Sequence, residues 1–202
     1  MLDLNIKEPK HRNAKNTFKT VESAAIALFY KQGYHKTTIG DITKKAGVAI
    51  GTFYLYFPSK IALYKHILSL FSYNIRKHIA EKVADIEDRY EKERAGLKAF
   101  ITYAQKNPEM YNIIWESLYI DRKLFKDYYE SFSIRYANGL SSAKQKGEIK
   151  DIDTEVISFV LMGINHFIGL KVIMDLGTNN SDIDHIVDEI MRLLKHGLFK
   201  KT

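Results

Sequence analysis

Hydroxyl and ammonium groups are concentrated in residues 37–63 of this 202-residue chain, which read TTIGDITKKAGVAIGTFYLYFPSKIAL. Thr52, Tyr54 and Lys60 can each donate a hydrogen bond to a phosphate oxygen, and Lys60 adds a positive charge. Gly51 has no side chain, so the backbone there can approach a ligand closely. These groups favour the binding of a polyanion.

Catalytic or metal-binding groups do not occur in a workable arrangement. The chain has no cysteine, which excludes disulfides, thiolate metal sites and cysteine nucleophiles. The seven histidines are scattered, and Asp182 and His185 are the nearest approach to a metal pair, with no third ligand at a suitable spacing. There is no glycine-rich phosphate loop and no pair resembling a nucleophile and its base. We therefore expect no enzyme activity, no metal and no other cofactor.

The segment that carries the hydroxyl groups has the pattern of a helix-turn-helix. Thr38 and Asp41 form a capping-box-like start for a short helix over residues 39–46. Gly47 supplies the backbone geometry of a sharp turn, and a second helix begins at about Ala49. Two short helices joined in this way are typical of a unit that reads DNA.

The positive charge lies in the same part of the chain. The net charge is +7, and residues 1–65 hold 11 Lys and Arg against 4 Asp and Glu, while the remainder holds 20 of each. Charge alone favours an ordinary solvated basic face, but together with the motif it favours nucleic acid. For the basic arm over residues 1–12, disorder is favoured over a minor-groove or phosphate contact.

Helical periodicity continues to the end of the chain, and no strand pattern is present, so we expect an all-α fold. An N-terminal three-helix helix-turn-helix domain is expected over residues 1–65, and a C-terminal helical ligand-binding and dimerisation domain over residues 66–202. The charged segment 88–94 is interpreted as a loop or exposed turn. The N-terminus lacks the pattern of a signal peptide, which favours a cytoplasmic location.

Residues 156–174 are almost wholly apolar and long enough to span a bilayer. Asn165, His166 and Lys171 argue against a membrane, because polar and charged groups are costly in its interior. A helix that is apolar on all sides is better explained by burial against its own core and a second subunit. We expect a homodimer formed through helices at about 153–175 and 182–198, with no membrane partner.

An ordered series of short motifs runs through residues 13–63: Leu28-Phe29, Gly33-Tyr34, Thr37-Thr38-Ile39, Asp41-Ile42, Ala46-Gly47-Val48, Gly51-Thr52-Phe53-Tyr54, Tyr56-Phe57 and Ser59-Lys60. In this order the motifs resemble the TetR family of repressors. Beyond residue 63 the resemblance is weaker and rests on helical character and on Gly147-Glu148-Ile149. It implies a homodimeric repressor whose N-terminal domains enter successive major grooves of a (pseudo)palindromic double-stranded DNA operator. It also implies a C-terminal domain that binds a small effector, which alters the separation of the N-terminal domains.

The resemblance and the residue chemistry together give this DNA-binding set: Thr37, Thr38, Lys45, Ala49, Ile50, Gly51, Thr52, Tyr54, Tyr56 and Lys60. Thr37 or Thr38 would meet phosphate at the start of the second helix, Lys60 would grip the DNA backbone, and for Tyr54 a phosphate contact is favoured over a core position. Ala49 stands where the family usually has Ser, so a side-chain cap worth about 1 kcal/mol is lost. Ile50 is apolar where the family is often polar, and it either touches a thymine methyl or stays exposed.

Aromatic residues are enriched in residues 100–136, which hold 10 of the chain's aromatic side chains. The candidate effector-binding set is Phe100, Tyr103, Tyr111, Trp115, Tyr119, Met162, His166 and Phe167. Core packing is an equally good explanation for Trp115 and Tyr119, and a core or interface position is favoured for His166. No cluster of Lys or Arg lies inside these helices, so we expect an apolar or aromatic effector such as an acyl compound. A purely structural or adaptor role for the C-terminal helices is the alternative.

Overall fold

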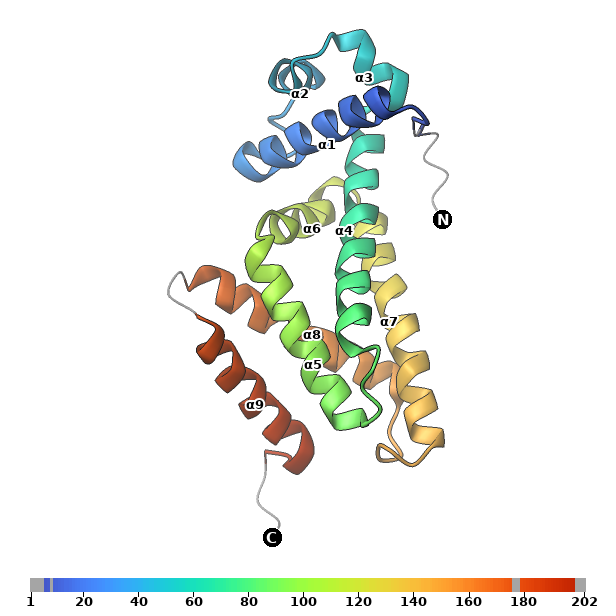
Figure 1. Cartoon of the computed structure of the whole chain (residues 1–202), viewed down its shortest axis with the longest axis vertical. Helices are drawn as coiled ribbons and strands as arrows, with labels where there is room; N and C mark the ends of the chain where they lie inside the picture. Colours follow the sequence, from blue (N-terminus) through green and yellow to red (C-terminus); the bar gives the residue numbers. More distant parts are fainter. Residues whose placement is uncertain (1–5, 8, 176–178, 199–202) are drawn as a thin grey trace. The chain divides into compact units, whose positions relative to one another are not determined.

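The computed structural model describes residues 6–7, 9–175 and 179–198 of the chain. Within this part the chain forms nine helices and no strand, which confirms the all-α prediction (Figure 1). The helices are α1 (Arg12–Gln32), α2 (Ile39–Ala46), α3 (Ile50–Tyr56), α4 (Lys60–Val83), α5 (Arg89–Lys106), α6 (Glu109–Ile120), α7 (Arg122–Gln145), α8 (Thr154–Met174) and α9 (Asn180–His196).

The chain divides into two compact units, and each is described by itself. Unit 1 comprises Met1–Tyr73 and Glu109–Tyr128, and unit 2 comprises Asn74–Pro108 and Tyr129–Thr202. The sequence-based boundary after residue 65 lies inside α4. Unit 1 also contains α6, which lies well beyond that boundary in the sequence.

Unit 1 is built around the aromatic and aliphatic side chains of its first four helices. α1 packs against α2 and α6, and α2 packs against α3. Phe18 of α1 contacts the ring of Phe57, with ring centroids 4.8 Å apart, and Phe57 contacts Phe53 of α3 at 5.7 Å. Phe53 and Phe57 are both fully buried. This aromatic cluster fixes α3 to α1, as expected when apolar side chains recur at helical spacing.

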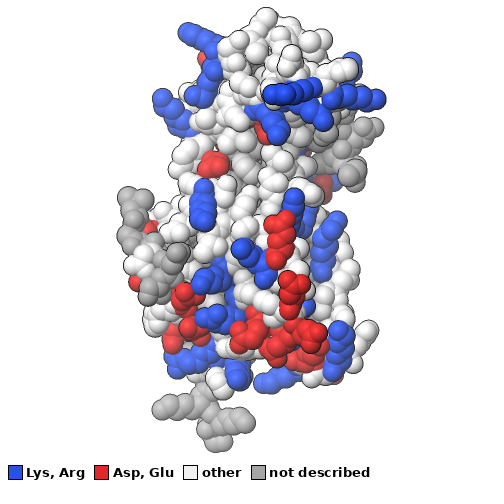
Figure 2. All heavy atoms as spheres, in the orientation of Figure 1, with Lys and Arg blue, Asp and Glu red and all other residues white. Residues whose placement is uncertain are grey.

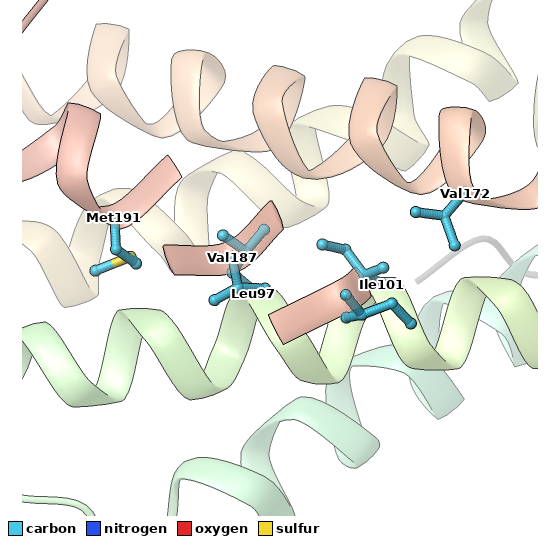
Figure 3. Close-up of a cluster of buried hydrophobic side chains, with 6 residues drawn as sticks. Leu97, Ile101, Val172, Val187 and Met191 are labelled. Carbon is cyan, nitrogen blue, oxygen red and sulfur yellow. The ribbon is translucent and has the colours of Figure 1, made fainter. Parts of the chain in front are cut away.

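Unit 2 has its core between α5, α8 and α9. Leu97 and Ile101 of α5 lie in one cluster with Val172 of α8 and with Val187 and Met191 of α9 (Figure 3). Ion pairs also join α5 to α9. The side chain of Arg94 forms an ion pair with Asp188 at 2.7 Å, and that of Lys98 forms one with Asp184 at 2.5 Å.

Residues 89–94 form the start of α5 and Asp88 is its N-cap, so the interpretation of 88–94 as a loop or exposed turn is wrong. The Asp88 carboxylate accepts a hydrogen bond from the backbone N–H of Glu91 at 2.8 Å and so caps α5. Arg89 and Glu93 then form an ion pair one turn apart inside the helix. The charges stabilise the first turns of a helix here, whereas the sequence interpretation assigned them to a solvated loop.

α8 and α9 carry large apolar side chains that the chain itself does not cover. The exposed members are Val156, Phe159, Val160, Phe167 and Met174 on α8, and Leu193, Leu194 and Leu198 at the end of α9 and just beyond it. α8 is also long and apolar enough to cross a membrane by length and composition. Its other side packs into unit 2 through residues such as Leu161 and Val172.

Candidate functional site

The outward face of α3 is formed by Ile50, Gly51, Tyr54 and Leu55. The side chains of Ile50, Tyr54 and Leu55 are 56%, 53% and 63% exposed, although α3 is anchored from behind by the buried ring of Phe53. Apart from its chain neighbours and the backbone of its own helix, a Cβ placed on Gly51 would meet no atom within 4 Å. Gly51 thus lies on an open surface to which another molecule can approach the backbone closely.

The preceding helix and turn set the direction of α3. The hydroxyl of Thr38 accepts a hydrogen bond from the N–H of Asp41, and the Asp41 carboxylate accepts from the N–H of Thr38, which confirms the predicted capping box. Gly47 has a φ of 67°, the left-handed conformation that the turn requires. Ala49 is the N-cap residue of α3 and gives no side-chain cap, as the sequence predicts.

The two threonines before α2 already use their hydroxyl protons within the protein. Thr37 is fully buried, and its hydroxyl donates to the carbonyl of Gly33 at 2.7 Å. Thr37 is therefore a core residue and has no surface to offer a phosphate. Thr38 is exposed, and its hydroxyl donates to the carboxylate of Asp41 at 2.7 Å. Hydrogen bonds from Thr38 also hold the pKa of Asp41 below its usual value.

Lys60 is bound to the protein backbone and is not positioned as a free phosphate ligand. Its ammonium donates to the carbonyls of Tyr34 and Thr37, both at 2.7 Å, and lies 4.1 Å from the centroid of the Tyr34 ring. Burial lowers the pKa of Lys60, and the carboxylate of Glu116 opposes that shift. In the structure Lys60 therefore ties the start of α4 to the turn between α1 and α2.

The same turn is held from its other side by α6, within unit 1. Glu116 of α6 accepts a hydrogen bond from the backbone N–H of Tyr34 at 2.7 Å. Gly33, the preceding residue, has a φ of 81°, and a Cβ there would lie 2.8 Å from the same carboxylate oxygen. Neither Glu116 nor its contact with the turn was found from the sequence, because the partners are 82 residues apart.

Of the remaining residues in the predicted DNA-binding set, Lys45 is exposed on the last turn of α2, whereas Thr52 and Tyr56 are half-buried. The ring of Tyr56 packs edge-on against Phe18 with centroids 5.5 Å apart. The N-terminal arm reaches the same place, because the backbone N–H of Lys7 donates to the carbonyl of Tyr56 at 3.1 Å. Residues 1–5 and 8 of the arm lie outside the described residues.

Positive charge lies beside the helix-turn-helix, while α3 itself carries none. Figure 2 shows an uncharged surface at the helix-turn-helix end of unit 1, with Lys and Arg side chains on both sides of it. Lys36, before α2, and Lys44 and Lys45, on its last turn, are exposed, whereas α3 itself carries no charged residue. An uncharged surface bordered by cations matches a duplex, whose phosphates flank the base edges of the groove.

The residues of the predicted effector set fall in both compact units. In unit 1, Tyr111 is buried in the core, Trp115 packs against Phe125 with ring centroids 5.9 Å apart, and Tyr119 is 79% exposed. Tyr111 is therefore a packing residue of unit 1. Tyr119 presents its ring at the surface.

In unit 2, Phe100, Tyr103 and Met162 are half-buried and Phe167 is 64% exposed. The ring of His78 packs against Tyr103 at 5.3 Å between centroids. His166 lies 3.2 Å from the hydroxyl of Tyr129, measured from Nε2, and burial lowers its pKa to about 4. His166 is therefore neutral at neutral pH.

A small cavity in unit 2, with room for about one water molecule, was not expected from the sequence. It lies among α5, α7, α8 and α9 and contains none of the predicted effector residues. Its lining is Glu93, Leu97, Tyr136, Leu161, Ile164, Asn165, Ile190, Met191 and Leu194. The Tyr136 hydroxyl donates to Glu93 at 2.5 Å, while the buried Oδ1 of Asn165 has no hydrogen-bond partner. Burial raises the pKa of Tyr136 to about 12.

Among the described residues, no three His, Asp or Glu side chains come together as a group that could hold a metal ion. In unit 1 the short exposed helix α3 is held by the buried ring of Phe53 and follows the capped helix α2 and the left-handed residue Gly47. This is the geometry of a helix-turn-helix, a motif that is typical of proteins that bind DNA.

A sequence profile described as bacterial regulatory proteins of the tetR family matches residues 23–67. The chain is 28% identical over 97 residues to the transcriptional activator FasR of Mycolicibacterium smegmatis, an alignment that covers 48% of this chain and 44% of FasR. The chain therefore spans less than half the length of this curated relative. The match covers the helix-turn-helix of unit 1, so this part of the chain is similar to the tetR family of bacterial regulatory proteins.

Solved structures share the fold over nearly the whole chain. The fatty acid degradation regulator FadR from Bacillus halodurans has a TM-score of 0.78 and 20% identity, covering 96% of this chain and 100% of that one. FadR from Bacillus subtilis in complex with stearoyl-CoA has a TM-score of 0.67 and 21% identity, covering 90% and 100%. These likenesses establish the fold, with an N-terminal helix-turn-helix and a helical C-terminal part.

Proposed function

We propose that this protein is a cytoplasmic transcriptional repressor that binds a palindromic operator as a homodimer and leaves it when a small apolar effector binds. The observation that carries the DNA-binding part is the location of charge. The whole net charge of +7 lies in residues 1–65, around a helix-turn-helix whose outward face is uncharged. A duplex supplies both the phosphates for the cations and a groove for α3.

The first test is binding to the DNA upstream of the chain's own gene, compared with random duplex, over a series of salt concentrations. We expect tighter binding to the upstream DNA and a steep loss of affinity with salt, because lysines release counterions from phosphate. Lys45→Ala should reduce the salt slope by about 1. Tyr54→Phe, which keeps the ring and removes the hydroxyl, should weaken binding by about tenfold through the loss of one charge-assisted bond.

Equal binding to upstream and random DNA would exclude control of its own gene, and binding to neither would exclude the DNA-binding function. The direction of regulation needs a reporter assay, since the relative FasR is named as an activator. A promoter that becomes more active when the protein is deleted supports repression. A promoter that becomes less active would identify this protein as an activator.

The proposed effector is apolar and contains an acyl chain. Six of the nine residues that line the cavity of unit 2 are Leu, Ile or Met, and no Lys or Arg lies among them. A solved protein of the same fold binds stearoyl-CoA, which supports the acyl class only by analogy of fold. Since the cavity is small, an acyl chain would enter by displacing these side chains.

Acyl compounds of increasing chain length should raise the unfolding temperature and release the operator at the same concentrations. Sugars and divalent metal salts are the matched controls. A response to the controls alone would overturn the apolar class. If nothing in either set shifts the unfolding temperature or releases DNA, the C-terminal helices have a structural role.

The proposed dimer uses the uncovered apolar faces of α8 and α9. Phe159 and Phe167 of α8 are 47% and 64% exposed, and Leu194 of α9 is 42% exposed. Apolar surface of this kind is stabilised when a second copy removes it from water. Two helices from each copy would form a four-helix interface.

A further inference from the structure

The exposed face of α3 lacks every side chain that forms paired hydrogen bonds with a base edge. Its sequence is IGTFYLY, without Arg, Lys, Asn, Gln, Asp or Glu. Arg and Lys pair with guanine, and Asn and Gln pair with adenine, so these modes of readout are closed to α3. Thr52 is half-buried, which leaves the hydroxyl of Tyr54 as the main polar group on this face.

Aliphatic surface takes the place of those groups at both ends of the face. Ile50 opens α3 and is 56% exposed, and Leu55 lies five residues later and is 63% exposed. Gly51 lies between them on a face with open space above it. A partner that covers these aliphatic groups removes their apolar surface from water, which is favourable. Lys44 and Lys45 are exposed on the last turn of α2, the helix that packs against α3, and their charge indicates that the partner is a polyanion.

In the major groove only thymine presents an apolar group, its 5-methyl, on the base edge. We propose that α3 selects its operator by the 5-methyl groups of thymines, one contacted by Ile50 and a second, at a different position of the half-site, contacted by Leu55. This inference rests on the proposed DNA-binding function and names the chemical feature of the operator that the helix recognises. The five-residue separation corresponds to about 7.5 Å along the helix, or about two base-pair steps.

Replacing thymine by uracil tests the proposal, because uracil keeps the base pair and lacks only the methyl group. The tightest duplex is selected from a random pool with the full-length protein, and is then resynthesised with deoxyuridine at one position at a time. We expect about a fourfold loss of affinity at each of two positions per half-site, the effect of one buried methyl group. At the other thymines the substitution should change affinity by less than twofold.

Two variants of the protein connect each methyl to its side chain. Ile50→Ala should bind more weakly and lose its sensitivity to uracil at one position, and Leu55→Ala should lose it at the other. Both side chains are exposed, so neither variant should unfold, and circular dichroism with thermal melting verifies this. The conservative variant Ile50→Val should retain the sensitivity of the original protein.

The outcomes separate the inference from the proposed function. If the selected duplex binds equally well with uracil at every position, the methyl readout is wrong while operator binding stands. The methyl readout is also wrong if both alanine variants keep the full uracil sensitivity. It is wrong as well if the variants lose self-association instead, because the face would then contact another copy of the protein. If no duplex is enriched over the pool, the DNA-binding function fails, and the inference fails with it.

Discussion

Replacing Lys60 tests whether this residue stabilises the fold or contacts DNA. In Lys60→Met the stem keeps its packing, and the ammonium with its two 2.7 Å hydrogen bonds to the carbonyls of Tyr34 and Thr37 is removed. Hydrogen bonds from a charged group are worth about 1.5–3 kcal/mol each when buried. Lys60 is partly exposed, and its own desolvation is relieved in the variant. Each of the two hydrogen bonds therefore contributes an energy at the lower end of that range. Their removal should reduce the free energy of unfolding by about 2–3 kcal/mol in total.

The assay is thermal unfolding together with the salt dependence of DNA binding. For a chain of this size, the expected loss lowers the unfolding temperature by about 5–10 °C. The slope of log K against log salt should not change, since Lys60 already uses its ammonium within the protein. Lys45→Met is the matched control, because Lys45 is exposed on α2, and here stability should stay within about 0.5 kcal/mol while the slope falls by about 1. A Lys60→Met protein with unchanged stability and a reduced slope would refute this reasoning and restore Lys60 as a phosphate ligand.

Three further predictions concern the rest of the chain. Gly33→Ala should destabilise the protein by about 2 kcal/mol in urea unfolding, because φ is 81° and the new Cβ would meet the carboxylate of Glu116; an unchanged midpoint would contradict this. His166 has its pKa lowered from 6.5 to about 4 by burial, so the unfolded chain takes up the proton first as pH falls. The free energy of unfolding should therefore drop by about 2 kcal/mol between pH 7 and pH 5, and His166→Gln should lose this part of the pH dependence. Phe167→Asp should shift sedimentation from dimer to monomer with α-helical content retained, and a dimer of undiminished stability would exclude Phe167 from the interface.

The local features of the helix-turn-helix were predictable from the sequence because they depend on neighbours in the chain. The capping box of Thr38 and Asp41 spans three residues, and the left-handed turn at Gly47 depends mainly on one. The absence of a side-chain cap at Ala49 follows directly from the residue type. Local hydrogen-bonding rules are sufficient for such features.

Features that depend on distant contacts were not predictable. The lysine at position 60 reaches back 26 residues to the carbonyl of Tyr34, so a residue that looks like a phosphate ligand acts within the protein. Thr37 is buried by packing that the sequence does not display. The aromatic residues of the predicted effector set showed correct helical spacing, but spacing alone does not tell a core ring such as Tyr111 from a surface ring such as Tyr119.

The shortness of α3 has a consequence for the temperature dependence of recognition. A seven-residue helix with no side-chain cap has too few hydrogen bonds to be stable alone. The packing of the buried ring of Phe53 therefore stabilises it. Its backbone amides should therefore open and exchange with solvent more readily than those of α1. Binding to a groove must suppress that opening and carries an entropic cost. Warming should consequently weaken DNA binding well below the temperature at which the whole protein unfolds.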